Sequence, residues 1–129
     1  MTPQRIETNT RITIINGIET LTVVAHEASK EAGWWDEEFT TETVPAKLCL
    51  IHSEVSEAME GYRKDLPDDK LTHRDMVEVE LADVLIRVAD LAERLGLDLG
   101  RAIVEKMEYN RTREDHKREN RAKAGGQKI

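Results

Sequence analysis

Apolar residues recur at steps of three and four along four stretches of the chain, which is the spacing of one face of an α-helix. The four stretches are residues 13–32, 43–64, 74–95 and 98–120. The start of the first stretch is ambiguous, because residues 11–15, RITII, also fit a short strand. Long helices joined by short links pack antiparallel, so the pattern predicts an all-α helical bundle of about four main helices.

Residues at the ends of these stretches support the same boundaries. Thr43 is a predicted N-cap with Pro45 in the first turn of its helix, and Asp98 is a predicted N-cap of the fourth helix. Gly33 and Gly96 follow the first and third stretches, where glycine commonly ends a helix.

The third stretch is the most apolar and has hydrophobic residues on more than one face. Its main stripe comprises Val77, Leu81, Val84, Leu85, Val88, Leu91, Ala92 and Leu95. Val79 and Ile86 add apolar surface on the far side, so this helix is expected to be buried nearly all round. We expect a second subunit to complete that burial. Residues 1–116 are predicted to form a single domain, and residues 117–129 a basic, disordered tail.

Composition narrows the classes of partner. The 129 residues are 35% charged and 4% aromatic, with a net charge of −7. Residues 1–100 hold 10 Lys and Arg against 21 Asp and Glu, and this acidic body argues against nucleic acid as a partner. No apolar run approaches the ~20 residues that span a membrane, and the first residues lack a signal peptide, so a cytoplasmic protein is expected. The single cysteine, Cys49, cannot form an internal disulfide and is expected in the core.

Two pairs of acidic residues interrupt the apolar helices. Glu54 and Glu57 stand three residues apart in the second helix, and Glu80 and Asp83 do so in the third. Residues at this spacing are neighbours on a helix surface. If the two helices pack side by side, four carboxylates can converge, and a divalent cation would offset their repulsion. Mg²⁺, with Mn²⁺ as an alternative ion, prefers such oxygen ligands.

A structural ion pair and other metals are the alternatives to a magnesium site. Glutamate pairs at this spacing are common on charged helices, and Arg87 could neutralise Asp83 or Asp90 in an ion pair. The sequence argues against a di-iron site of the Glu-x-x-His type, because none of the four histidines has a glutamate three residues before it. One cysteine and scattered histidines disfavour zinc, and no glycine-rich phosphate loop is present.

The ordered set ExxE at 54–57, ExxD at 80–83 and KMEYNRTR at 106–113 resembles the MazG-like all-α nucleoside triphosphate pyrophosphohydrolases. Dimeric dUTPases, dCTP pyrophosphatases and phosphoribosyl-ATP pyrophosphohydrolases are relatives in that superfamily. The resemblance covers about residues 44–113 and implies Mg²⁺-dependent cleavage between the α and β phosphates of an NTP or dNTP. It also implies a homodimer or homotetramer.

The resemblance assigns roles to individual residues. It implies metal ligands at Glu54, Glu57, Glu80 and Asp83, and one of the first two would orient the attacking water. The substrate-binding residues that it implies are Lys106, Asn110 and, with a weaker match, Arg113. Their spacing of four and then three residues also places them on one helix face, suited to phosphate oxygens and a sugar hydroxyl. A solvated basic face is the alternative.

Trp34 and Trp35 are the other candidates for substrate binding. A nucleobase could stack on either ring, although one or both could instead close the end of the bundle. The chain departs from the family pattern at Ser53, where many relatives have a further glutamate, and at Arg87, one turn beyond Asp83. A non-catalytic helical oligomerisation module and a nucleotide-binding regulator remain alternatives to the enzyme.

Overall fold

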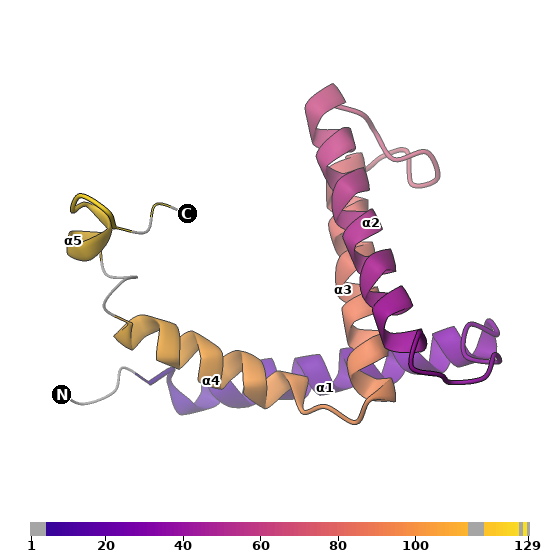
Figure 1. The fold of residues 1–129 in the computed structure, drawn as a ribbon, viewed down its shortest axis with the longest axis horizontal. Helices are drawn as coiled ribbons and strands as arrows, with labels where there is room; N and C mark the ends of the chain where they lie inside the picture. The colour runs from indigo at the N-terminus through magenta and orange to yellow at the C-terminus, as the bar shows by residue number, and fades with distance from the viewer. Residues whose placement is uncertain (1–4, 114–117, 127, 129) are drawn as a thin grey trace. The chain divides into compact units, whose positions relative to one another are not determined.

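The chain is all-α in a computed structural model that describes residues 5–113, 118–126 and 128 (Figure 1). Its helices are α1 (Thr8–Glu31), α2 (Thr43–Lys64), α3 (Met76–Arg94), α4 (Leu99–Thr112) and α5 (Arg118–Arg121). The described residues contain no strand, only an isolated antiparallel bridge between Pro67 and Asp75. The predicted all-α fold class is confirmed. No helix in this part of the chain combines the length and apolar character that a membrane span requires.

The chain divides into two compact units. One consists of residues 20–97, and the other combines residues 1–19 with residues 98–129. Helix α1 contributes its first half to one unit and its second half to the other. The single domain proposed for residues 1–116 stays a prediction.

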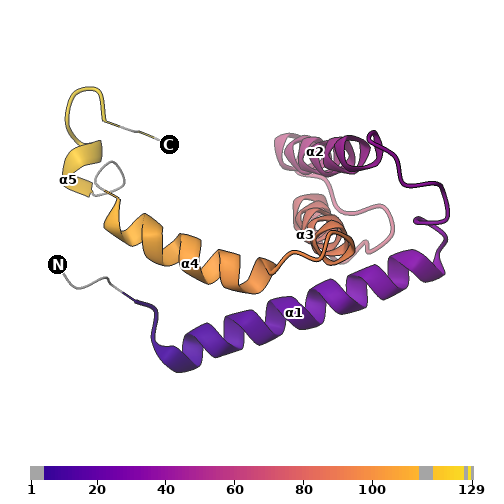
Figure 2. The ribbon, with the colours of Figure 1, turned by 60° about the horizontal axis from the view of Figure 1, so that its bottom comes forward.

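In the unit of residues 20–97, α2 and α3 lie side by side and antiparallel (Figures 1 and 2). The backbone N–H of Met76 donates to the carbonyl of Leu66, which ties the first turn of α3 to the loop after α2. Gly61 makes close packing possible here, because a Cβ on this residue would lie 2.7 Å from the Cγ of Met76. This contact helps to fix the register in which the acidic pairs of the two helices face each other.

In the other unit, α4 runs antiparallel to the first half of α1. The carboxylate of Glu108 accepts a hydrogen bond from the backbone N–H of Ile6 at 2.8 Å and pairs with Arg11. Gly100 meets the backbone of Ile15 at the other end of the contact, and Val104 between them is fully buried.

Several predicted boundaries were right. Helix α2 spans the predicted residues 43–64, and Gly33 and Gly96 have the positive φ angles of helix-ending glycines. Asp98 caps α4 as expected, since its side chain accepts a hydrogen bond from the N–H of Arg101.

Other boundaries were wrong for local reasons. Helix α1 begins at Thr8, five residues before the predicted start at residue 13, so the helical alternative for RITII is the one found. The Glu7 carboxylate accepts the N–H groups of Asn9 and Thr10 at this end of the helix. Thr43 is the first residue of α2 rather than its N-cap, and its hydroxyl accepts a hydrogen bond from Thr40.

Two predicted helices were too long. Helix α3 spans only Met76–Arg94, within the predicted residues 74–95. Helix α4 ends at Thr112 rather than at residue 120, and the Thr112 hydroxyl bonds back to the carbonyl of Tyr109. Residues 114–117 lie outside the described part of the chain, as do residues 127 and 129 of the predicted tail.

The core of one chain is small, so many apolar side chains are left uncovered. Leu81, Leu85 and Ile86 are 51%, 59% and 46% exposed, so the prediction that α3 is buried nearly all round was wrong for a single chain. Cys49 is also exposed rather than part of the core. Helix α3 can bury only the faces that its neighbours within the chain cover, and the rest of its stripe is available to another surface.

Replacing Gly100 by alanine is expected to destabilise the protein. The new Cβ would lie 3.0 Å from the carbonyl oxygen of Ile15, and backbone cannot move aside as a side chain can. We expect a net loss of about 1–2 kcal/mol in the free energy of unfolding, overpacking outweighing the higher helix propensity of alanine. Gly17→Ala is the matched control, because a Cβ there meets nothing within 4 Å. Denaturant titration should show this control to be neutral or stabilised, and equal effects at both sites would contradict the packing argument.

Candidate metal centre and adjoining cavity

Three glutamates from α2 and α3 meet in the antiparallel contact. One carboxylate oxygen from each of Glu54, Glu57 and Glu80 lies within 4.8 Å of the other two. Glu54 and Glu80 are each only 9% exposed, whereas Glu57 lies at the exposed side of the group. We call these three residues the glutamate cluster.

Glu80 is the most constrained member of the glutamate cluster. Its Oε2 atom is buried and has no hydrogen-bond partner among the described residues. Burial is the main reason that the pKa of Glu80 is raised to about 8. The neighbouring Glu54 and Glu57 raise it further, because they accept a hydrogen bond from the protonated form of Glu80 and repel its charged form. Without a cation, the cluster therefore holds a proton at neutral pH.

Asp83, the fourth predicted ligand, lies beside the glutamate cluster rather than within its tight group. Burial raises the pKa of Asp83 first, and the charge of Glu54 raises it further, while Arg87 lowers it. Asp68 of the α2–α3 loop also raises this pKa, so a further carboxylate stands near the site. Asp68 is 4% exposed and accepts the N–H groups of Lys70 and Leu71.

Arg87 pairs with a different acid from those considered in the sequence. Its Nε donates to Oε1 of Glu54 at 2.8 Å, and not to Asp83 or Asp90. Only one cation thus reaches the glutamate cluster directly among the described ion pairs. A single guanidinium offsets part of the charge of three glutamates and one aspartate.

The residues present fit a hard divalent cation. All the donors are carboxylate oxygens held on two packed helices, which is the ligand chemistry of Mg²⁺ and Mn²⁺. A bound cation would also give the buried Oε2 of Glu80 the partner that it lacks. Glu54, Glu57 and Glu80 are the residues that would hold it, with Asp83 next to them.

A cavity of about 310 Å³ adjoins the glutamate cluster. Its lining includes Glu54, Asp83 and Arg87. Trp34, Trp35 and Asp90 line it as well. Its volume lies at the lower end of the ~300–1,000 Å³ typical of small-molecule sites. The cavity can therefore hold part of a small molecule beside these carboxylates.

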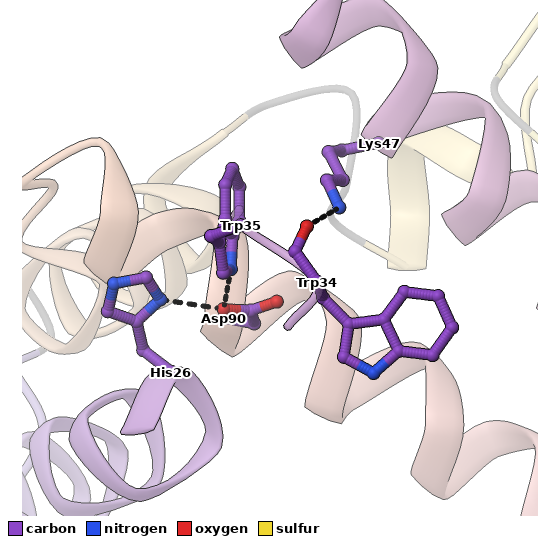
Figure 3. A network of polar contacts seen from close by, with 5 residues as sticks. All are labelled: His26, Trp34, Trp35, Lys47 and Asp90. Carbon is purple, nitrogen blue, oxygen red and sulfur yellow. Dashed lines mark hydrogen bonds and ion pairs between the residues drawn. The ribbon is translucent and has the colours of Figure 1, made fainter. Parts of the chain in front are cut away.

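Asp90 joins three elements at this cavity (Figure 3). Its Oδ1 accepts a hydrogen bond from Nε1 of Trp35 at 2.8 Å and lies 2.8 Å from Nδ1 of His26. The imidazole packs edge-on against the Trp35 ring, with centroids 5.7 Å apart. These contacts hold Trp35 and Asp90 in fixed orientations.

The two tryptophans have different environments. Trp35 is half-buried, and the Nζ of Lys47 lies 4.4 Å from its ring centroid. Trp34 is 62% exposed, and its carbonyl accepts a hydrogen bond from the same lysine. Both line the cavity, which keeps a stacking role open, and Trp35 also has the contacts expected of a ring that closes the end of the bundle.

The basic residues predicted to bind substrate belong to the other compact unit. Lys106 and Asn110 lie on α4, and Arg113 is its C-cap. The cations of Lys106 and Arg113 lie 4.8 and 5.9 Å from the ring centroid of Tyr109, so these side chains share one face. The Oδ1 of Asn110 is buried without a hydrogen-bond partner among the described residues. That these residues act together with the glutamate cluster stays a prediction.

Sequence reasoning did not assign site roles to His26, Lys47, Asp68 and Asp90. Only Asp90 gave a signal, because at about 100° per residue it falls on the same narrow strip of the third helix as Glu80, Asp83 and Arg87. Nothing in the spacing of residues 26, 35 and 90 indicates that they meet.

Comparisons of this chain with known protein families, with curated proteins and with solved structures returned no match.

Proposed function

We propose that the chain is a Mg²⁺-dependent nucleoside triphosphate pyrophosphohydrolase, as its resemblance to the MazG-like superfamily implies. It would cleave an NTP or dNTP between the α and β phosphates to a nucleoside monophosphate and pyrophosphate. The observation that carries the proposal is the glutamate cluster, in which Glu80 has a buried oxygen without a partner among the described residues. The adjoining cavity with its tryptophans supports a ligand larger than a cation alone.

The surroundings of each side chain indicate the role that it would have in the reaction. A bound Mg²⁺ supplies charge neutralisation for the triphosphate and lowers the pKa of water. Glu57 is the carboxylate that we assign to orient the water and accept its proton, because it is exposed and forms no ion pair with a described residue. Glu54 is less suited as a base, since its Oε1 already accepts a hydrogen bond from Nε of Arg87. The water oxygen would form a bond to the α phosphorus and its proton would pass to Glu57, while the bond from the α phosphorus to the bridging oxygen breaks and pyrophosphate leaves.

Positively charged side chains are needed to bind the phosphates of the nucleotide. Arg87 lines the cavity beside the glutamate cluster, where its remaining N–H groups can donate to phosphate oxygens. Lys106, Asn110 and Arg113 are proposed to contact phosphate and sugar, as the resemblance implies. Trp34 or Trp35 would present a ring face to the base. Removal of damaged nucleotides and control of the nucleotide pool, both consistent with a cytoplasmic location, would suit this chemistry.

The direct test is pyrophosphate release from a panel of NTPs and dNTPs in the presence of Mg²⁺. At least one nucleotide should give equal amounts of pyrophosphate and monophosphate, and chelation of the metal should stop the reaction. A folded protein that releases no pyrophosphate from any nucleotide would overturn the proposal. If Mg²⁺ and nucleotide still raised its melting midpoint, the chain would be a nucleotide-binding regulator; with no such shift it would be an oligomerisation module.

We also propose that the enzyme is a homodimer or homotetramer. Val55, Met59 and Tyr62 lie along one face of α2 and are 50%, 61% and 74% exposed. Leu81 and Leu85 add exposed apolar surface on α3. Apolar surface of this kind on two neighbouring helices is the usual mark of a subunit interface.

Met59→Glu is expected to shift the protein to monomer. In a monomer this change at an exposed site should alter the free energy of unfolding by no more than about 0.5 kcal/mol. In a dimer it would bury a charge in an apolar interface, so the assembly should dissociate. Sedimentation equilibrium measures the difference, with Glu60→Gln on the same helix as the control. A wild-type protein that is monomeric at all concentrations would contradict the prediction.

A further inference from the structure

The two carboxylate oxygens of Asp90 differ in their hydrogen bonding to the described residues. Oδ1 lies 2.8 Å from both Nε1 of Trp35 and Nδ1 of His26. Oδ2 accepts no hydrogen bond from any described residue, and Figure 3 shows it on the side away from the imidazole. The Asp90 side chain is only 14% exposed.

The two contacts fix which oxygen stays available. The indole N–H can only donate, and a carboxylate can only accept, so Nδ1 of His26 must also be the donor. Both donors converge on Oδ1, which prevents the carboxylate from exchanging its oxygens freely. Because Asp90 lines the cavity together with both tryptophans, the cavity contains an acceptor of defined orientation.

An N–H donor on a nucleobase would complement this carboxylate oxygen. A carboxylate oxygen attracts an N–H donor and repels a carbonyl oxygen. Cytosine carries an exocyclic amino group where uracil carries a carbonyl, and the two rings have otherwise nearly the same shape. A fixed acceptor beside an aromatic surface can therefore distinguish these two bases.

We infer that Asp90 determines base specificity, accepting a hydrogen bond from the exocyclic amino group of the nucleobase, so that cytosine nucleotides are bound in preference to uracil nucleotides. The inference rests on the proposed function, in which the base occupies the cavity while the triphosphate reaches the glutamate cluster. His26 and Trp35 act through Asp90 as positioning residues. Asp90 lies outside the glutamate cluster, so its proposed role is separate from metal binding.

Asp90→Asn should invert the preference. Trp35 still needs an acceptor, so the amide oxygen of Asn takes the place of Oδ1 and the NH₂ group takes the place of Oδ2. The group offered to the base changes from an acceptor to a donor, which suits the carbonyl of uracil. Trp35→Phe should instead reduce the preference, because it keeps an aromatic ring but removes one of the two donors that hold Oδ1, leaving only His26.

The experiment compares dCTP with dUTP as substrates and CMP with UMP as ligands, by kcat/KM and by calorimetry. The wild-type protein should favour cytosine by about 10- to 100-fold, the discrimination of a well-placed base contact. Asp90→Asn should bring this ratio below one, and Trp35→Phe should lower it without inverting it, since His26 still holds Oδ1. Asp36→Asn is the control, since it removes the same charge from an exposed residue next to Trp35.

The outcomes separate this inference from the proposed function. Turnover with equal or uracil-favouring ratios in the wild type, or a ratio unchanged in both variants, would overturn the role of Asp90 and leave the enzyme intact. Absence of turnover with preferential binding of CMP would overturn only the enzymatic proposal. Each ratio is measured within one variant, so partial loss of folded protein cancels, and Trp35→Phe tests the role if Asp90→Asn does not fold.

Discussion

Glu80→Gln is expected to lower pyrophosphate release by more than about 100-fold, because even residues that only orient metal ligands cost 10- to 100-fold when replaced. The same variant should be more stable than the wild type at pH 8 in the absence of divalent metal. A neutral amide can donate to the neighbouring glutamates, whereas the wild-type carboxyl must either keep a proton or place a third negative charge in the cluster. Pyrophosphate assay and thermal unfolding measure the two effects.

Opposite changes in activity and stability distinguish a metal site from a structural ion-pair network. Glu78→Gln is the matched control, because Glu78 lies two residues away on α3 and its ion pair with Arg74 is exposed. This control should alter neither property by much. A Glu80→Gln protein that loses stability at pH 8 without metal would show that Glu80 is a structural residue.

The stability of the metal-free wild type is expected to fall as the pH rises from about 5.5 to 8.5. The pKa of Glu80 is raised from 4.5 to about 8, so over this range the folded state keeps a proton that the unfolded state has released. The unfolded state therefore binds fewer protons, and stability decreases with pH until Glu80 ionises in the folded state. The raised pKa of Asp83 also makes stability fall as the pH rises.

Mg²⁺ should reverse this trend. The cation and the proton compete for the carboxylate of Glu80. As the pH rises, the proton competes less well and Mg²⁺ binds more tightly. The increase in melting midpoint caused by saturating Mg²⁺ should be larger at pH 8.5 than at pH 6. The lowered pKa values of Glu7, Glu60, Asp98 and Glu108 act at more acidic pH and do not produce this effect. A Mg²⁺ shift that is the same at both pH values, or that persists in Glu80→Gln, would contradict the assignment.

The helices were largely predictable, because their boundaries depend on local patterns. The apolar period gave the span of α2, and Gly33, Gly96 and Asp98 marked helix ends that the structure confirms. Errors occurred where a side chain competed with or capped the backbone, as at Glu7 and Thr112. Such hydrogen bonds involve common polar residues and leave little trace in the hydrophobic pattern.

The candidate site was predictable only in part. Spacing of three residues places Glu54 with Glu57 on one helix face, and Glu80 with Asp83 on another, whatever the rest of the chain does. Spacing cannot determine which members of the two pairs come into contact. That choice depends on the register and rotation of α2 against α3, which the close packing at Gly61 helps to set.

Local patterns are therefore enough to predict an all-α protein with two acidic pairs in apolar helices. Packing of the helices brings Glu80 together with Glu54 and Glu57 and pairs Arg87 with Glu54. It also places His26 and Trp35 against Asp90. These two kinds of feature differ in how far apart in the sequence the interacting residues lie. Helix formation and i, i+3 spacing depend only on neighbouring residues. Ion pairs, buried carboxylates and a cavity lined from α1, α2 and α3 arise only when distant segments pack.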